Sequence, residues 1–230
     1  MDIDPVSLKI SQPSLFDFID NTTGAIELFP AVWSAAEDLN APEVTARRSG
    51  LERLVAIGAP RLSPLIAYLL ATRLQDPDLD LRIQVVKTIG ELYLPDEQGR
   101  MVPDRVLRQL NWYLSQMHTR AVFGLLQVAN DCQAMEAHVA RILNACPYGG
   151  NHLAGILADR KAPMPVRKQA ANMIGTVGFL DAVPVLERLV IRLEARVNGQ
   201  QTMVFAPPPV PDEAELLPAV MKSLEMLRTA

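Results

Sequence analysis

Residues 46–70, ARRSGLERLVAIGAPRLSPLIAYLL, decide the fold, because the chain repeats their pattern at residues 166–190, VRKQAANMIGTVGFLDAVPVLERLV. The two stretches align without a gap. Their matching positions include punctuating residues as well as apolar ones: Arg47 and Arg167, Leu54 and Ile174, Gly58 and Gly178, Pro64 and Pro184, Leu69 and Leu189. Such self-similarity indicates a repeat protein, in which one structural unit recurs along the chain.

Each unit predicts two helices. Gly58 is placed to end the first helix, because glycine accepts the positive φ angle of a helix C-terminus. Pro64 is placed to begin the second helix, since the first turn tolerates its missing N–H. Two antiparallel helices cannot bury both of their apolar stripes alone, so neighbouring units are expected to stack. The two stripes recur at helical spacing: Leu51, Leu54, Val55 and Ile57, then Leu65, Ile66, Leu69 and Leu70.

Weaker copies of the unit fill the rest of the chain. Residues 76–94 place Arg82 at the position of Arg47 and predict a first helix, followed by a second helix near 104–115. Residues 117–146 predict two helices with a break near 131–132, and a short helix is expected at 151–159. Residues 27–39 are predicted to form the second helix of a capping half-repeat, and residues 213–228 a terminal helix.

The motif Asp-Pro-Asp at 76–78, followed by Leu-Arg and an apolar stripe ending in Ile-Gly, resembles the HEAT-repeat family. Pro-Val-Arg at 165–167, followed by Ala-Ala and Ile-Gly, is similar to it as well. The resemblance covers roughly residues 25–195 and is strongest at 41–94 and 161–195. It implies an all-α fold, a right-handed α-α superhelix (an armadillo-like α-solenoid) of about four to five helix pairs with a capping half-repeat. It further implies that second helices line a concave face.

The chain is accordingly divided into four parts. Residues 1–24 are expected to be an N-terminal leader, 25–196 the repeat solenoid, 197–212 a Pro-rich loop or short hairpin, and 213–230 a terminal capping helix. Asn198-Gly199 favours a turn and residues 206–211 favour polyproline II. This third part either returns the chain so that the last helix can pack, or docks a partner.

Composition argues against several classes of function. The 230 residues carry a formal net charge of -4, whereas proteins that bind nucleic acid through its phosphates show a basic excess. The N-terminus has no basic start followed by an apolar run, and no stretch approaches the ~20 apolar residues of a membrane span. Two cysteines in 230 residues suit a reducing compartment. We therefore expect a soluble, cytoplasmic protein that does not bind membranes.

No catalytic residue, cofactor or metal is expected. The most suggestive set is Cys132, His138, Cys146 and His152, the side-chain types that bind zinc. A helix over 134–145 would hold the two cysteines about 20 Å apart, too far for one ion. The histidines lie in no known nucleophile signature, and the chain has no Gly-rich phosphate-binding loop. The sequence therefore favours binding over catalysis.

A binding face is predicted on the outward positions of the second helices. If Leu65, Ile66 and Leu69 are buried, then Ala67, Tyr68, Ala71 and Thr72 should face outward, and repeat offsets carry this face to other units. Arg188, Arg192 and Arg196 lie on one helix face at i, i+4 and i+8, with Glu187 and Glu194 beside them. The simpler interpretation of this ridge is a solvated, partly neutralised helix face. The partner-binding candidates are Trp33, Tyr68, Arg108, Trp112, Arg188, Arg192 and Arg196. Aromatic residues and arginine often anchor protein interfaces.

The sequence thus predicts a scaffold or adaptor that binds a protein partner. The alternatives are a nucleic-acid-binding, DNA-glycosylase-like or bilin-lyase-like member of the same family, or a subunit that assembles through the Pro-rich part. The glycosylase-like proteins use a strongly cationic groove, which an acidic chain does not favour. Other repeat positions are assigned to the framework: Arg47, Arg82 and Arg167, which should bind loop carboxylates and carbonyls between units, and Gly58, Gly178, Pro64 and Pro184.

Overall fold

The computed structural model describes residues 26–197 and 213–229, and within these ranges the chain is all-α, without strands. The predicted leader at 1–24 and residues 198–212 of the predicted Pro-rich loop or hairpin lie outside the described residues. The α-helices are α2 (Pro30–Leu39), α3 (Val44–Ala56), α4 (Ala59–Leu62), α5 (Pro64–Thr72), α6 (Leu79–Leu92), α7 (Asp104–Ser115), α8 (Thr119–Asp131), α9 (Glu136–Asn144), α10 (Gly149–Ala158), α11 (Met164–Val177), α12 (Val183–Val197) and α13 (Leu217–Thr229). Five 3-10 helices accompany them: η2 (Ile26–Leu28), η3 (Arg73–Gln75), η4 (Gln133–Met135), η5 (Leu180–Ala182) and η6 (Glu213–Leu216). None of these described helices is long and apolar enough to cross a membrane.

Helix boundaries fall on the glycines and prolines that the repeat alignment singles out. Gly58 lies after α3 with φ 76°, and Gly178 ends α11 with φ 88°. These are left-handed conformations that strain any residue with a side chain. Pro64 is the first residue of α5 and Pro184 the second residue of α12. The short helix α4, which the pattern does not predict, occupies the connection between α3 and α5.

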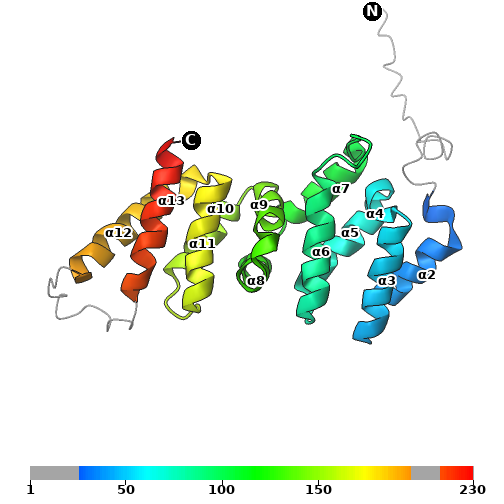
Figure 1. Cartoon of the computed structure of the whole chain (residues 1–230), viewed down its shortest axis with the longest axis horizontal. Helices are drawn as coiled ribbons and strands as arrows, with labels where there is room; N and C mark the ends of the chain where they lie inside the picture. The colour runs from blue at the N-terminus through cyan, green and yellow to red at the C-terminus, as the bar shows by residue number, and fades with distance from the viewer. Residues whose placement is uncertain (1–25, 198–212, 230) are drawn as a thin grey trace, which may run out of the picture.

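The helices form a row of packed pairs. In the described part of the chain, α3, α6, α9, α11 and α13 make one layer in which each helix contacts the next. Four other helices form a second layer that packs on this one: α2 on α3, α5 on α6, α10 on α11, and α12 on α13. Figure 1 shows the row along the long axis of the molecule, with α2, α5 and α12 crossing behind the first layer. Each pair is therefore supported mainly by its neighbours.

The middle of the row departs from simple alternation. The helix predicted near 104–115 is α7, and it packs on α5 rather than on α6, which precedes it. Helix α8 follows and contacts α9, α10 and α11, so it belongs with the second layer. The first layer then continues with α9. Two consecutive helices in the second layer explain why the repeat pattern weakens between residues 104 and 144.

The apolar stripes are predicted correctly only in part. Leu51 and Leu54 of α3, and Ile66 and Leu70 of α5, are fully buried. Val55, however, is 45% exposed because it lines a groove on the outside of α3 and α6. Ile57, at the C-terminal cap of α3, is 41% exposed.

The expected outward face of α5 is wrong at its two alanines. Ala67 and Ala71 are fully buried, whereas Leu65 and Leu69 are only half-buried. The reason is that α7 also packs on α5, so this helix is covered on more than one side. The small alanine side chains allow that close approach.

Gly50 of α3 lies close against the backbone of α2. A Cβ atom at this position would lie 2.5 Å from the backbone nitrogen of Leu39 and 2.6 Å from the carbonyl oxygen of Ala35. Both neighbours are backbone atoms of α2 and cannot rotate away. The first helix pair therefore depends on the absence of a side chain at position 50.

We expect Gly50→Ala to lower the free energy of unfolding by about 1–3 kcal/mol, the usual cost of forcing an extra carbon into a packed interface. Gly155→Ala is the matched control, because Gly155 lies within α10 with no atom within 4 Å of its added Cβ. That change should raise stability by about 0.5–1 kcal/mol, since alanine restricts the unfolded chain and favours helix. Urea denaturation followed by circular dichroism measures both. Equal effects of the two substitutions would contradict the close approach.

Candidate functional site

Two tryptophans among the predicted binding residues are exposed. Trp33 of α2 is 47% exposed and Trp112 of α7 is 59% exposed. The indole Nε1 of Trp33 donates a hydrogen bond to the carbonyl oxygen of Glu27 at 2.6 Å, which fixes the ring against η2. Arg108, one turn before Trp112 on α7, is also exposed. These large side chains are accessible to a partner.

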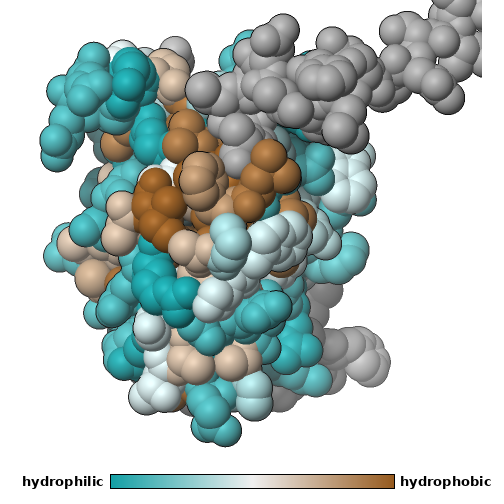
Figure 2. Space-filling model, turned by 90° about the vertical axis from the view of Figure 1, so that its right-hand side faces the viewer, coloured by the Kyte–Doolittle hydropathy of each residue, from teal (hydrophilic) through white to brown (hydrophobic). Residues whose placement is uncertain are grey.

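The end of the row that carries α2 also presents apolar surface. Figure 2 looks at this end and shows apolar side chains gathered there. On η2 and at the start of α2, Leu28 is 74% exposed and Phe29 is 60% exposed. A tryptophan, a phenylalanine and a leucine are therefore exposed within the first elements of the described chain.

Tyr68 has a packing role that its predicted outward position did not include. Its ring lies against that of Tyr113 in an edge-to-face contact, with centroids 5.4 Å apart and planes at 84°. The pair joins α5 to α7, and both rings are half-buried. Burial raises the pKa of the Tyr113 hydroxyl, and the neighbouring Tyr68 raises it further. Tyr68 is thus partly used in holding α7 on α5.

The predicted arginine ridge on α12 is not a free surface. Arg188 is exposed and donates from Nε to the Pro184 carbonyl at 3.0 Å. Arg192, by contrast, binds the Glu213 carboxylate at 3.1 Å, and Arg196 binds the same carboxylate. Their partner is neither Glu187 nor Glu194, the two neighbours that the sequence suggested. The ridge is consequently divided between one exposed arginine and two that hold a buried acid.

Glu213 is the centre of a buried ion cluster. Its side chain is 1% exposed and lies within 3.8 Å of Arg160 and 3.0 Å of Arg167, in addition to the two arginines of α12. Arg167, also 1% exposed, donates from Nε to the carbonyl of Leu157 at 2.9 Å. One carboxylate thus joins the connection after α10, the start of α11, the end of α12 and the segment before α13.

The cluster is electrostatically unequal, because four guanidinium groups surround one carboxylate. Burial alone would raise the pKa of Glu213, but the hydrogen bond from Arg167 and the charges of Arg192, Arg196 and Arg160 bring it below its ordinary value. Burial lowers the pKa of Arg192, and the other arginines lower it further against the opposing effect of Glu213. The carboxylate therefore stays ionised and holds together groups that would otherwise repel.

Arg47 makes a similar contact set at the other end of the row. Its guanidinium donates to the carbonyls of Ala41 and Pro42 at 3.2 and 2.6 Å and to the Asp76 carboxylate at 2.9 Å. Asp76 is 1% exposed, so the pair is shielded from water. These are the loop carbonyl and carboxylate contacts that the sequence predicts for the repeated arginines.

Arg82 differs from the other two repeated arginines. Among the described residues its side chain has no hydrogen-bond or ion-pair partner, and its Nε atom is shielded from solvent. It lines a pocket of about 400 Å³ bounded by η3, α6 and α8. The sequence assigns Arg82 a framework role, and within residues 26–197 and 213–229 its side chain makes no contact of that kind.

The cysteines and histidines that resemble zinc ligands lie in separate surroundings. His138 packs against Gly90 of α6, whereas His152 pairs with Thr119 at 2.9 Å. Burial raises the pKa of the Cys146 thiol, which disfavours the reactive thiolate. Within the described residues, no three His, Cys, Asp or Glu side chains are placed to share a metal ion.

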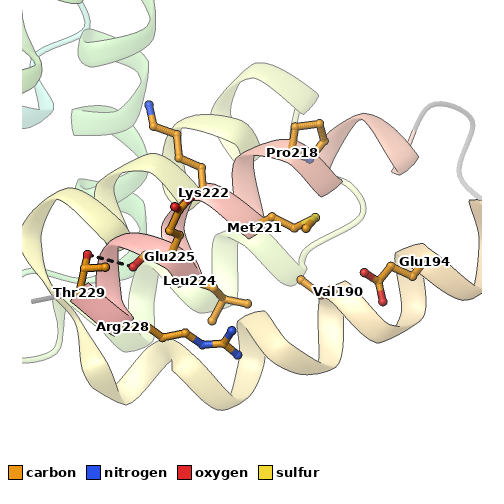
Figure 3. Close-up of a pocket in the computed structure, with 9 residues that line it drawn as sticks. All are labelled: Val190, Glu194, Pro218, Met221, Lys222, Leu224, Glu225, Arg228 and Thr229. Carbon is orange, nitrogen blue, oxygen red and sulfur yellow. Dashed lines mark hydrogen bonds between the residues drawn. The ribbon is translucent and has the colours of Figure 1, made fainter.

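A pocket of about 620 Å³ lies between α12 and α13 at the opposite end of the row (Figure 3). Met221, 50% exposed, and the largely buried Leu224 supply apolar surface. Its charged residues are of both signs: Glu194, Lys222, Glu225 and Arg228. This balance of charge indicates no particular class of ligand.

No protein-family model matches the sequence, and searches of curated proteins and of solved structures likewise give no match.

Proposed function

We propose that the chain is a non-catalytic scaffold, similar to HEAT-repeat proteins, that binds a protein partner through its second-layer helices. The exposed Trp112 carries this proposal. An indole that is 59% exposed on a helix whose other face is buried leaves a large apolar area in water. Trp and Arg are the residues that most often dominate binding energy in protein interfaces, and Arg108 lies one turn away.

The proposed architecture is a right-handed superhelix of HEAT-like repeats. Its support is the row of packed helix pairs together with a recurring register. Arg47, Arg82 and Arg167 are each the fourth residue of a first-layer helix, α3, α6 and α11. Position-specific recurrence of this kind is what stacked repeats require.

A nucleic-acid-binding or base-processing role has less support. The feature that suggested it was the arginine ridge of α12, and Arg192 and Arg196 bind Glu213 instead of remaining free for phosphates. No described residue favours a bilin-lyase-like reaction over binding. Assembly through the Pro-rich part concerns residues outside the described ranges.

An aromatic photo-crosslinking amino acid at position 112, which keeps a large apolar ring in place of the Trp112 indole, tests the binding surface in cells that express the protein. We expect a discrete crosslinked protein from position 112 and none from position 87, because Lys87 is an exposed residue of the first layer. Adding Arg108→Ala to the crosslinking variant should reduce the yield about tenfold, the effect of losing roughly 1.4 kcal/mol of binding. Equal yields at 112 and 87, or no crosslink at 112, would sink the proposed surface.

A further inference from the structure

The three repeated arginines occupy one structural position but do not share one environment. Arg47 and Arg167 each bind a backbone carbonyl and a buried carboxylate, that of Asp76 and that of Glu213 respectively. Each carboxylate comes from the segment just before the next first-layer helix with which the unit packs: Asp76 precedes α6, and Glu213 precedes α13. The fold thus has a recurring site for one carboxylate beside the fourth residue of a first-layer helix.

At Arg82, no described residue supplies the expected carboxylate. The next first-layer helix is α9, and the segment before it, residues 132–135, reads Cys-Gln-Ala-Met. Glu136, the first residue of α9, accepts a hydrogen bond from Gln169 at 3.0 Å, and Asp131 is exposed next to Asn130. No acidic side chain of the described chain takes the place that Asp76 and Glu213 fill.

The space beside Arg82 is open and positively charged. Helix α8 turns residues 120, 123, 124 and 127 toward this pocket, so that Arg120 joins Arg82. Asp76 also lines the pocket, but Arg47 binds both of its oxygen atoms. The two glutamines can donate amide hydrogens to an anion. The full lining is Gln75, Asp76, Pro77, Arg82, Arg120, Phe123, Gly124 and Gln127.

We propose that this pocket binds a glutamate or aspartate side chain from an acidic segment of a protein partner, completing at Arg82 the contact that the chain makes internally at Arg47 and Arg167. The identification of the partner as a protein rests on the proposed function. A carboxylate suits the site because arginine binds it through two parallel hydrogen bonds, and the two equivalent arginines each hold one.

Titration of fluorescently labelled hexaglutamate into the full chain tests the pocket. We expect binding that Arg82→Gln weakens about tenfold, as the loss of a charged hydrogen bond does. Lys87→Gln removes one exposed positive charge from the same helix and is the control. It should change the affinity for hexaglutamate less than twofold. Hexaglutamine should not bind. No binding of hexaglutamate, or equal losses in the two variants, would overturn the proposal.

Three further experiments test the chemistry of the ligand and the role of Arg82. If inorganic phosphate displaced the peptide at equal concentration, the pocket would be a phosphate site, and the proposal of a carboxylate ligand would be overturned. A melting temperature lowered by Arg82→Gln as far as by Arg47→Gln would make Arg82 structural and overturn the proposal. Arg120→Glu should place a carboxylate in the pocket from within, raising the melting temperature and abolishing hexaglutamate binding.

The outcome is distinguishable from that of the proposed function. Crosslinking at position 112 without hexaglutamate binding would remove the pocket and keep the scaffold. Hexaglutamate binding that depends on Arg82, without crosslinking at 112, would keep the pocket and remove the Trp112 surface.

Discussion

Glu213→Gln is expected to lower the free energy of unfolding by about 3–5 kcal/mol, the usual cost of breaking a buried ion pair from one side. The substitution keeps the shape of the side chain but leaves Arg167 buried without its carboxylate, among three other guanidinium groups. Urea denaturation of the full chain at neutral pH, followed by circular dichroism, measures the change.

Glu215→Gln is the matched control, because Glu215 is 56% exposed and pairs with Lys168 at the surface. The effect of Glu215→Gln on the free energy of unfolding should be much smaller.

The stability gained from Glu213 should also depend on pH. Because the folded-state pKa of Glu213 lies below its ordinary value of 4.5, the contribution is present above that value and is lost as pH falls through the folded-state pKa. Wild type and Glu213→Gln should therefore converge in acid; a constant difference would contradict the cluster.

Arg47→Met is expected to lower the free energy of unfolding by about 3–5 kcal/mol, for the same reason at the opposite end of the row. Asp76, at 1% exposure, would lose its closest cation and keep only Arg73 at 3.9 Å. The carbonyls of Ala41 and Pro42 would lose their donor as well. Chemical denaturation of the variant measures the loss, and protection of α2 and α3 amides from hydrogen exchange locates it.

Arg48→Met is the control for Arg47→Met. The neighbouring arginine binds Asp78 at 2.7 Å and Asp80 at 2.9 Å, but these groups are partly or largely exposed. Solvent screens such pairs, so the substitution should have little effect on stability. If Arg48→Met were as damaging as Arg47→Met, burial of the Asp76 pair would not be the cause.

Local features of the sequence were sufficient to predict most helices. Gly58 and Pro64 mark helix ends through their own backbone preferences, so no distant contact is needed to interpret them. The same holds for the helix near 104–115, found as Asp104–Ser115. Local sequence does not predict which other helices a given helix face will contact. Ala67 and Ala71 are buried because α7 returns to α5, and nothing within α5 itself indicates that return.

In the candidate site, too, one part could be predicted from local sequence and another part could not. Trp112 could be identified as exposed from its place opposite the buried face of α7, defined by Val106, Leu110 and Leu114. The role of Arg192 and Arg196 could not, because Glu213 follows them only after residues 198–212, which interrupt the repeat spacing. A usable signal did exist. Glu213 stands shortly before a first-layer helix, as Asp76 does before α6.

The lack of a partner for Arg82 among the described residues has a mechanical consequence for the row. Ion pairs clamp the units at both ends, through Asp76 and Glu213, whereas the described residues provide no such clamp at Arg82. In an array whose units are held mainly by their neighbours, each ion pair between units adds to the stiffness of its own joint. We expect a carboxylate bound beside Arg82 to brace the joint between α6 and α8, as Asp76 and Glu213 brace the joints at the two ends.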